Sequence, residues 1–102
     1  MNIKKATKFH ISFRTGSIYP IDHKGITAVL GFRGTQGDPD KVKREWRFTV
    51  DGIPCAIWDY KGSHKAPYCQ YSCYMPAAIG KELFGDKFHS EDEYRLDVRP
   101  DV

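Results

Sequence analysis

The dipeptide Asp51-Gly52 is the feature that most constrains the fold of this chain. Apolar and polar residues alternate on both sides of it, from Glu45 to Val50 and from Ile53 to Lys61. Asp-Gly in that setting favours a two-residue β-hairpin turn, because both turn residues tolerate a positive φ. A two-residue turn also fixes the register of the two strands. We therefore predict that Val50 lies opposite Ile53 and that each further pair follows from this one.

The predicted register divides the hairpin into two faces, because successive side chains of a strand point to opposite sides. One face is apolar and ends in an expected ion pair; its pairs are Val50–Ile53, Phe48–Cys55, Trp46–Ile57 and Arg44–Asp59. The other face mixes charged and aromatic residues, in the pairs Thr49–Pro54, Arg47–Ala56, Glu45–Trp58 and Lys43–Tyr60. We expect the first face to pack in the core, and the second is a candidate binding face.

Two segments outside the hairpin have the periodicity and the end signals of helices. The first begins at Asp22, whose side chain can cap a helix, and ends at Gly31, where a left-handed residue is favoured. The second begins after Pro76, which pre-sets the first helical turn, and ends at Gly85. Gly25 weakens the first helix by about 1 kcal/mol relative to alanine, so this helix needs tertiary packing.

Three other segments, 9–14, 69–74 and 94–99, alternate between apolar and polar residues, as half-buried strands do. Thr15-Gly16-Ser17 breaks the first of them, and 18–21 follows as an extended segment. Glycine and proline assign 34–41 and 62–67 to loops. The sequence thus predicts one domain, residues 1–102, of the α+β class. Its small antiparallel sheet, built around the Asp-Gly hairpin, packs against two short helices.

The charge and the cysteine content limit the classes of function. The net charge of +3 and the pI near 8.8 are only mildly basic, so they permit nucleic-acid binding without demanding it. No apolar run approaches the ~18–20 residues of a membrane span. Three cysteines, an odd number, suit reduced thiols in a reducing compartment. We therefore expect a cytoplasmic protein that does not bind membranes.

A metal site and a catalytic centre are both weakly supported. His64, Cys69, Cys73 and His89 are ligand types that zinc accepts, but the two-residue spacing of zinc knuckles is absent. On a strand, Cys69 and Cys73 would lie about 13 Å apart at ~3.3 Å per residue, too far for one metal ion. No phosphate-cradling loop or catalytic triad pattern is present. We expect no metal, no cofactor and no catalytic residues.

The second face of the hairpin places cations beside aromatic rings, an arrangement that binds anions and stacks on ring ligands. The alternative is that the aromatic side chains pack beneath another part of the chain and the cations are solvated. The candidate binding residues on and near this face are Arg14, Lys43, Arg47, Trp58, Tyr60, Lys61 and His64.

Six short motifs occur together along the chain: Phe9-His10-Ile11-Ser12-Phe13-Arg14-Thr15-Gly16-Ser17, Asp38-Pro39-Asp40-Lys41-Val42, Trp46-x-Phe48, Asp51-Gly52, Ile57-Trp58-Asp59-Tyr60-Lys61-Gly62-Ser63 and Leu83-Phe84-Gly85-Asp86. In this combination the chain resembles a group of small proteins encoded by tailed bacteriophages. The resemblance supplies no catalytic residues. It implies a setting in the host cytoplasm, where such accessory proteins act by binding.

Together these observations predict a non-enzymatic phage accessory protein that binds a host or defence-system protein, or a small anionic signal molecule. A counter-defence inhibitor is one form of that role. The first alternative is a nucleic-acid-binding module that uses the same hairpin face, and the second is a small enzyme. The sequence leaves the oligomeric state open.

Overall fold

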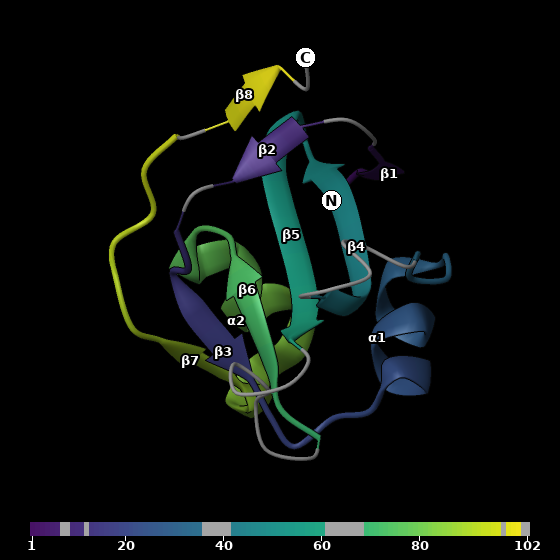
Figure 1. Cartoon of the computed structure of the whole chain (residues 1–102). Helices are drawn as coiled ribbons and strands as arrows, with labels where there is room; N and C mark the ends of the chain where they lie inside the picture. The colour runs from purple at the N-terminus through teal and green to yellow at the C-terminus, as the bar shows by residue number, and fades with distance from the viewer. Residues whose placement is uncertain (7–8, 12, 36–41, 61–68, 97, 101–102) are drawn as a thin grey trace.

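The structure is a computed structural model, and it describes residues 1–6, 9–11, 13–35, 42–60, 69–96 and 98–100. It contains a six-stranded antiparallel sheet, two short helices and a separate two-stranded ribbon (Figure 1). The predicted α+β class, with an antiparallel sheet packed against two short helices, is therefore confirmed.

The elements follow one another in an order that differs from their order in the sheet. Along the chain they are β1 (Ile3–Lys5), β2 (Phe9–Ile11), β3 (Gly16–Ile18), α1 (His23–Leu30), β4 (Val42–Val50), β5 (Ile53–Tyr60), β6 (Tyr71–Tyr74), α2 (Ala77–Phe84), the 3-10 turn η2 (Gly85–Lys87), β7 (Phe88–Ser90) and β8 (Val98–Pro100). The large sheet has the strand order β1-β4-β5-β6-β3-β7, and β2 pairs with β8 in the ribbon.

The central hairpin has the predicted turn and nearly all of the predicted register. Asp51 and Gly52 adopt φ values of 51° and 83°, which the two-residue turn requires. The predicted pairs from Val50–Ile53 to Arg44–Asp59 all form. The Lys43–Tyr60 pair is wrong: the register shifts between Val42 and Arg44, and Val42 lies opposite Tyr60. A bulge of this kind adds one residue to one strand, and nothing in the alternation indicates it.

Both predicted helices form with the predicted ends. Asp22 caps α1, and its carboxylate accepts a hydrogen bond from the Gly25 amide at 2.8 Å. Gly31 ends the helix in the left-handed conformation, with φ of 88°, and its amide donates to the Thr27 carbonyl. Pro76 directly precedes α2, and Gly85 follows it.

The short strands differ from what the sequence predicts. Residues 16–18, expected in part to interrupt a strand, form β3, while β1 and β7 are not predicted at all. Of the predicted strand over 94–99, only the C-terminal end forms a strand, β8, and residues 94–96 belong to no strand. A Cβ at Gly16 would lie 2.5 Å from the His89 carbonyl oxygen. This glycine therefore permits the close approach of β3 to β7 rather than breaking a strand.

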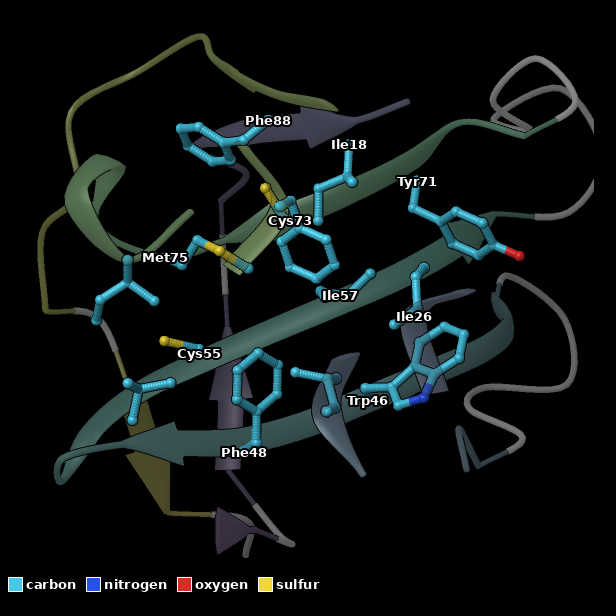
Figure 2. Packing of buried hydrophobic residues seen from close by; sticks show 14 residues of the cluster. Ile18, Ile26, Trp46, Phe48, Cys55, Ile57, Tyr71, Cys73, Met75 and Phe88 are labelled. Atoms are coloured by element: carbon cyan, nitrogen blue, oxygen red, sulfur yellow. The ribbon is translucent and has the colours of Figure 1, made fainter. Parts of the chain in front are cut away.

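The first face of the sheet carries the main core. Apart from Ile53, which is exposed beside the turn, the predicted apolar residues of the hairpin are buried there against both helices. The cluster consists of Ile18, Ile26, Leu30, Trp46, Phe48, Val50, Cys55, Ile57, Tyr71, Cys73, Met75, Ile79, Phe84 and Phe88. Figure 2 shows Trp46 and Tyr71 at one end of this cluster and Met75 toward the other. The rings of Trp46 and Tyr71 meet edge to face, with centroids 5.7 Å apart.

The second face of the sheet is covered as well. Trp58 is only 9% exposed, and it packs with Ala56 and Tyr74 beneath Ile11, Phe13 and Tyr94. Figure 1 shows β2 crossing in front of β5 on this side of the sheet. The Tyr74 hydroxyl donates to the Arg95 carbonyl, and the Tyr94 hydroxyl donates to the Pro54 carbonyl at 3.0 Å. These bonds fix the segment around Tyr94 over the second core.

Because both tryptophans are buried, on opposite faces of one hairpin, we expect each to contribute strongly to stability. Trp46→Ala and Trp58→Ala should each lower the free energy of unfolding by about 3–5 kcal/mol, as other large-to-small core substitutions do. Ile53→Ala, in the same hairpin but 38% exposed, is the matched control and should cost about 1 kcal/mol or less. Urea unfolding followed by circular dichroism measures all three. A tryptophan variant no less stable than Ile53→Ala would contradict the burial of that ring.

Candidate anion-binding site

The predicted hairpin face does not present a free aromatic ring in the described part of the chain. Trp58 lies in the second core, so it corresponds to the packing alternative rather than to a stacking platform. Arg47 pairs with Glu45 at 3.2 Å. Arg14 pairs with Glu91 at 2.8 Å and reaches the Ser72 hydroxyl at 3.5 Å. The structure therefore brings Arg14, Arg47 and Trp58 to one face, but with intramolecular partners.

The other residues predicted to bind on the hairpin face lie wholly or in part outside the described structure. Lys61 and His64 lie outside the described residues, as do the side chains of Lys43 and Tyr60. Their assignment to a binding surface stays a prediction.

A basic cavity lies elsewhere, between α1, the segment that follows it and β4. Its volume is about 370 Å³, and its lining residues are His23, Lys24, Thr27, Arg33, Gly34 and Arg44. Four of these six residues have basic side chains. None of the four is among the residues predicted to bind.

The local structure explains how distant residues meet at this cavity. His23 and Lys24 form the first turn of α1, and Thr27 lies one turn further along the same side. Beyond the left-handed turn that ends α1, Thr35 forms a bridge with Glu45 of β4, and both N–H···O bonds measure 2.7 Å. This bridge holds Arg33 and Gly34 against β4, where Arg44 lies.

Gly34 forms a thin wall between the cavity and the core. A Cβ at this position would lie 2.7 Å from both Cε2 of Trp46 and Cγ of Arg44. The indole of Trp46 therefore lies directly against the backbone of Gly34. Its Nε1 is buried and has no hydrogen-bond partner among the described residues.

The cations of the cavity are not neutralised by salt bridges within the described part of the chain. The ion pairs there join other residues, and none involves His23, Lys24, Arg33 or Arg44. Arg44 lies opposite Asp59 as predicted, but no salt bridge joins these two described residues. Asp22, the carboxylate that precedes α1, is engaged by the helix cap. The three fixed cations Lys24, Arg33 and Arg44 outnumber the two neighbouring carboxylates, so the cavity presents a net positive charge among the described residues.

Charged residues near the cavity also change the pKa of Tyr71, whose side chain lies in the main core. Burial is the main cause that raises its pKa, and the Asp59 carboxylate raises it further, whereas the Arg44 guanidinium lowers it. Arg44 therefore influences both the cavity and the core residue beside Trp46.

The cysteines are reduced, and two of them are inert for a physical reason. Cys55 and Cys73 are buried in the main core, and burial raises the pKa of Cys55 to about 12 and that of Cys73 even further. Cys69 is half-buried and has a positive φ of 65°. Its carbonyl accepts a hydrogen bond from the Ile21 amide at 2.9 Å, which ties it to the segment before α1.

The metal hypothesis receives no support from the described residues. Within them, no three His, Cys, Asp or Glu side chains are grouped closely enough to hold a metal ion. Of the four candidate ligands, Cys73 is buried in the core and His89 stacks on Tyr19 at a centroid distance of 3.8 Å, while His64 lies outside the described range. The helices that the structure describes are also too short and too polar to cross a membrane.

Comparison with known proteins gives no relative: no family model, no curated protein and no solved structure matches the chain. The resemblance to phage proteins therefore stays a prediction.

One signal for the cavity is present in the sequence itself. His23, Lys24 and Thr27 share one side of a helix whose ends are predicted correctly. Arg33 and Gly34 follow that helix directly. What the sequence does not reveal is the bridge between Thr35 and Glu45, which brings these residues to Arg44.

Filling the wall of the cavity should destabilise the protein. We expect Gly34→Ala to lower the free energy of unfolding by about 1–3 kcal/mol, because the new methyl group overlaps the buried indole of Trp46. Gly52→Ala is not a suitable control, since its φ is positive. Ala28→Gly, at an exposed position of α1, changes one methyl group without a steric conflict and should cost about 1 kcal/mol. Thermal unfolding of both variants measures the difference, and a Gly34→Ala variant as stable as wild type would exclude a rigid wall.

The buried thiols should make the protein less stable at high pH. In the unfolded chain Cys55 ionises near its ordinary pKa of 9.0, whereas in the folded protein it stays protonated up to about pH 12. Its contribution is therefore fully present below pH 9 and is lost as the pH rises toward 12, at about 1.4 kcal/mol per pH unit. Urea unfolding between pH 8 and 11 measures this slope. Cys55→Ala should reduce the slope by about that amount, and an unchanged slope would refute the assignment.

Proposed function

We propose that this protein is a non-enzymatic binding protein whose small anionic ligand occupies the cavity between α1 and β4. One observation carries the proposal: three cationic side chains, those of Lys24, Arg33 and Arg44, line a single cavity, and the described residues offer none of them a carboxylate partner in a salt bridge. Charges that are left unpaired around a concave surface attract an anion, because the cavity walls focus their field.

The size and the chemistry of the cavity favour a small molecule. A volume of about 370 Å³ is near the lower end of the range for ligand pockets. Arg33 and Arg44 carry planar guanidinium groups that bind carboxylate or phosphate through two parallel hydrogen bonds. Lys24 and His23 add a cation and a titratable donor at the other end of α1.

The resemblance to tailed-phage proteins supplies a biological setting for this proposal. In the cytoplasm of an infected host, an accessory protein that binds a small anionic signal molecule would lower its free concentration. That is the counter-defence role expected from the sequence, with the ligand site on α1 and β4 instead of on the hairpin face.

No observation favours the alternative functions to the same degree. A nucleic-acid module would use Trp58 as a stacking platform, but Trp58 is 9% exposed and belongs to a buried cluster against which Ile11, Phe13 and Tyr94 pack. Contact with a host protein through Arg14 or Arg47 would compete with the ion pairs that these residues form within the chain. The cavity itself requires no such competition.

A panel of anionic metabolites, screened by thermal shift, tests the proposal. We expect at least one compound to raise the melting temperature of wild-type protein, with an effect that weakens as salt increases. The double variant Lys24→Glu/Arg33→Glu should lose this effect. Both residues are exposed, and a glutamate in the first turn of α1 interacts favourably with the helix dipole, so the fold is preserved.

The matched control is Lys81→Glu/Lys87→Glu, which makes the same change of charge at exposed positions of α2 and η2. It should respond to the ligand as wild type does. A shift that persists in Lys24→Glu/Arg33→Glu, or one that disappears equally in the control, would refute the cavity as the binding site. Nuclease-sensitive capture of nucleic acid would instead support the alternative module.

A further inference from the structure

We infer that the ligand is held through two or more linked phosphates, and that the cavity does not discriminate between the organic groups attached to them. This inference rests on the proposed function and specifies the chemistry of the ligand. Three features of the cavity carry it: the spread of its cations, the kind of donors it offers and the place of the nearest aromatic ring.

The cations come from both ends of α1. Lys24 belongs to its first turn, whereas Arg33 follows its last residue. A helix of eight residues spans roughly 10–12 Å at 1.5 Å per residue, so the backbone positions that carry Lys24 and Arg33 are well separated along the helix axis. Linked phosphates are longer than a single phosphate or carboxylate, so they are better suited to contact both side chains at once.

The donors match phosphate oxygens in number and in charge. Lys24, Arg33 and Arg44 are fixed cations, and Thr27 adds a hydroxyl between the two ends of the helix. A linked pair of phosphates offers charged oxygens to all three cations at once, which a monocarboxylate with its two oxygens does not. The nearby carboxylates of Asp22 and Asp59 reduce the excess without cancelling it.

The position of Trp46 argues against recognition of a nucleobase. None of the described residues that line the cavity is aromatic apart from the imidazole of His23. The indole nearest to the cavity is that of Trp46, which is 1% exposed and lies behind Gly34. A base would therefore have no large ring on which to stack within the cavity, and stacking is the usual source of affinity for unpaired bases.

The same arrangement supplies a reporter for binding. Trp46 lies behind the cavity wall, and Trp58 is on the opposite face of the sheet, so Trp58→Phe leaves one indole that is close to the ligand. We would titrate this variant with tripolyphosphate, pyrophosphate, orthophosphate and citrate, and with the diphosphates of adenosine and cytidine. Isothermal titration calorimetry of wild-type protein provides a second readout that does not depend on the indole.

We expect tripolyphosphate and pyrophosphate to bind at least about tenfold more tightly than orthophosphate and citrate, a difference of about 1.4 kcal/mol or more. The two nucleoside diphosphates should bind within about threefold of each other, which corresponds to less than about 1 kcal/mol. Lys24→Glu/Arg33→Glu should weaken the binding of pyrophosphate by about tenfold or more, while Lys81→Glu/Lys87→Glu should leave it unchanged.

Other outcomes separate the two proposals. If citrate binds as tightly as tripolyphosphate and needs Lys24 and Arg33, the cavity is an anion site but the linked-phosphate inference is wrong. A strong preference for one nucleoside diphosphate would likewise overturn it, because the cavity would then read the base. If none of these anions binds and no compound of the metabolite panel raises the melting temperature, both proposals fail.

Discussion

The register of the β4–β5 hairpin is the constraint on which the rest of the structure depends. β5 pairs with β4 on one side and with β6 on the other, and its alternate residues enter two different cores. A shift of one residue would move Ile57 out of the main core and place Trp58 in it. The turn at Asp51-Gly52 prevents that shift, because only one pairing is compatible with its two positive φ values. The cavity depends on this register too, since Arg44 is placed by it.

The parts of the fold that were predictable are those whose signals are local. The hairpin register and the ends of both helices follow from residues within a few positions of each other. The three-residue strands β1, β3 and β7 carry no such signal, because an alternation over three residues is too short to recognise. Each of them forms by pairing with a strand that is distant in the sequence: β1 with β4, and β3 with β6 and β7. The bulge before Arg44 was missed for a similar reason: it is a property of the pairing of two strands.

The candidate site could not be predicted from the sequence for a similar reason. The sequence predicted cations beside aromatic rings because the register of the hairpin places them on one face, and the structure uses that face for packing around Trp58. The cations of the cavity come from three places along the chain, namely the first turn of α1, the segment after it and β4. A contact between Thr35 and Glu45 brings them together, and neither residue carries a functional signal by itself.

The N-terminal strands have a consequence for how the chain is made. β1 lies at one edge of the sheet, beside β4, whereas β3 lies beyond β6 (Figure 1). Between these two strands in the sequence, Ile11 and Phe13 pack against the cluster that contains Trp58. The partners of the N-terminal strands occur much later in the sequence, and β7, the last strand of the large sheet, pairs with β3. During synthesis these strands therefore leave the ribosome before any strand that they will pair with. In the nascent hairpin the indole of Trp58 stays exposed to solvent until the N-terminal residues are anchored by their strand partners. In that interval chaperones and neighbouring chains compete for the same surface.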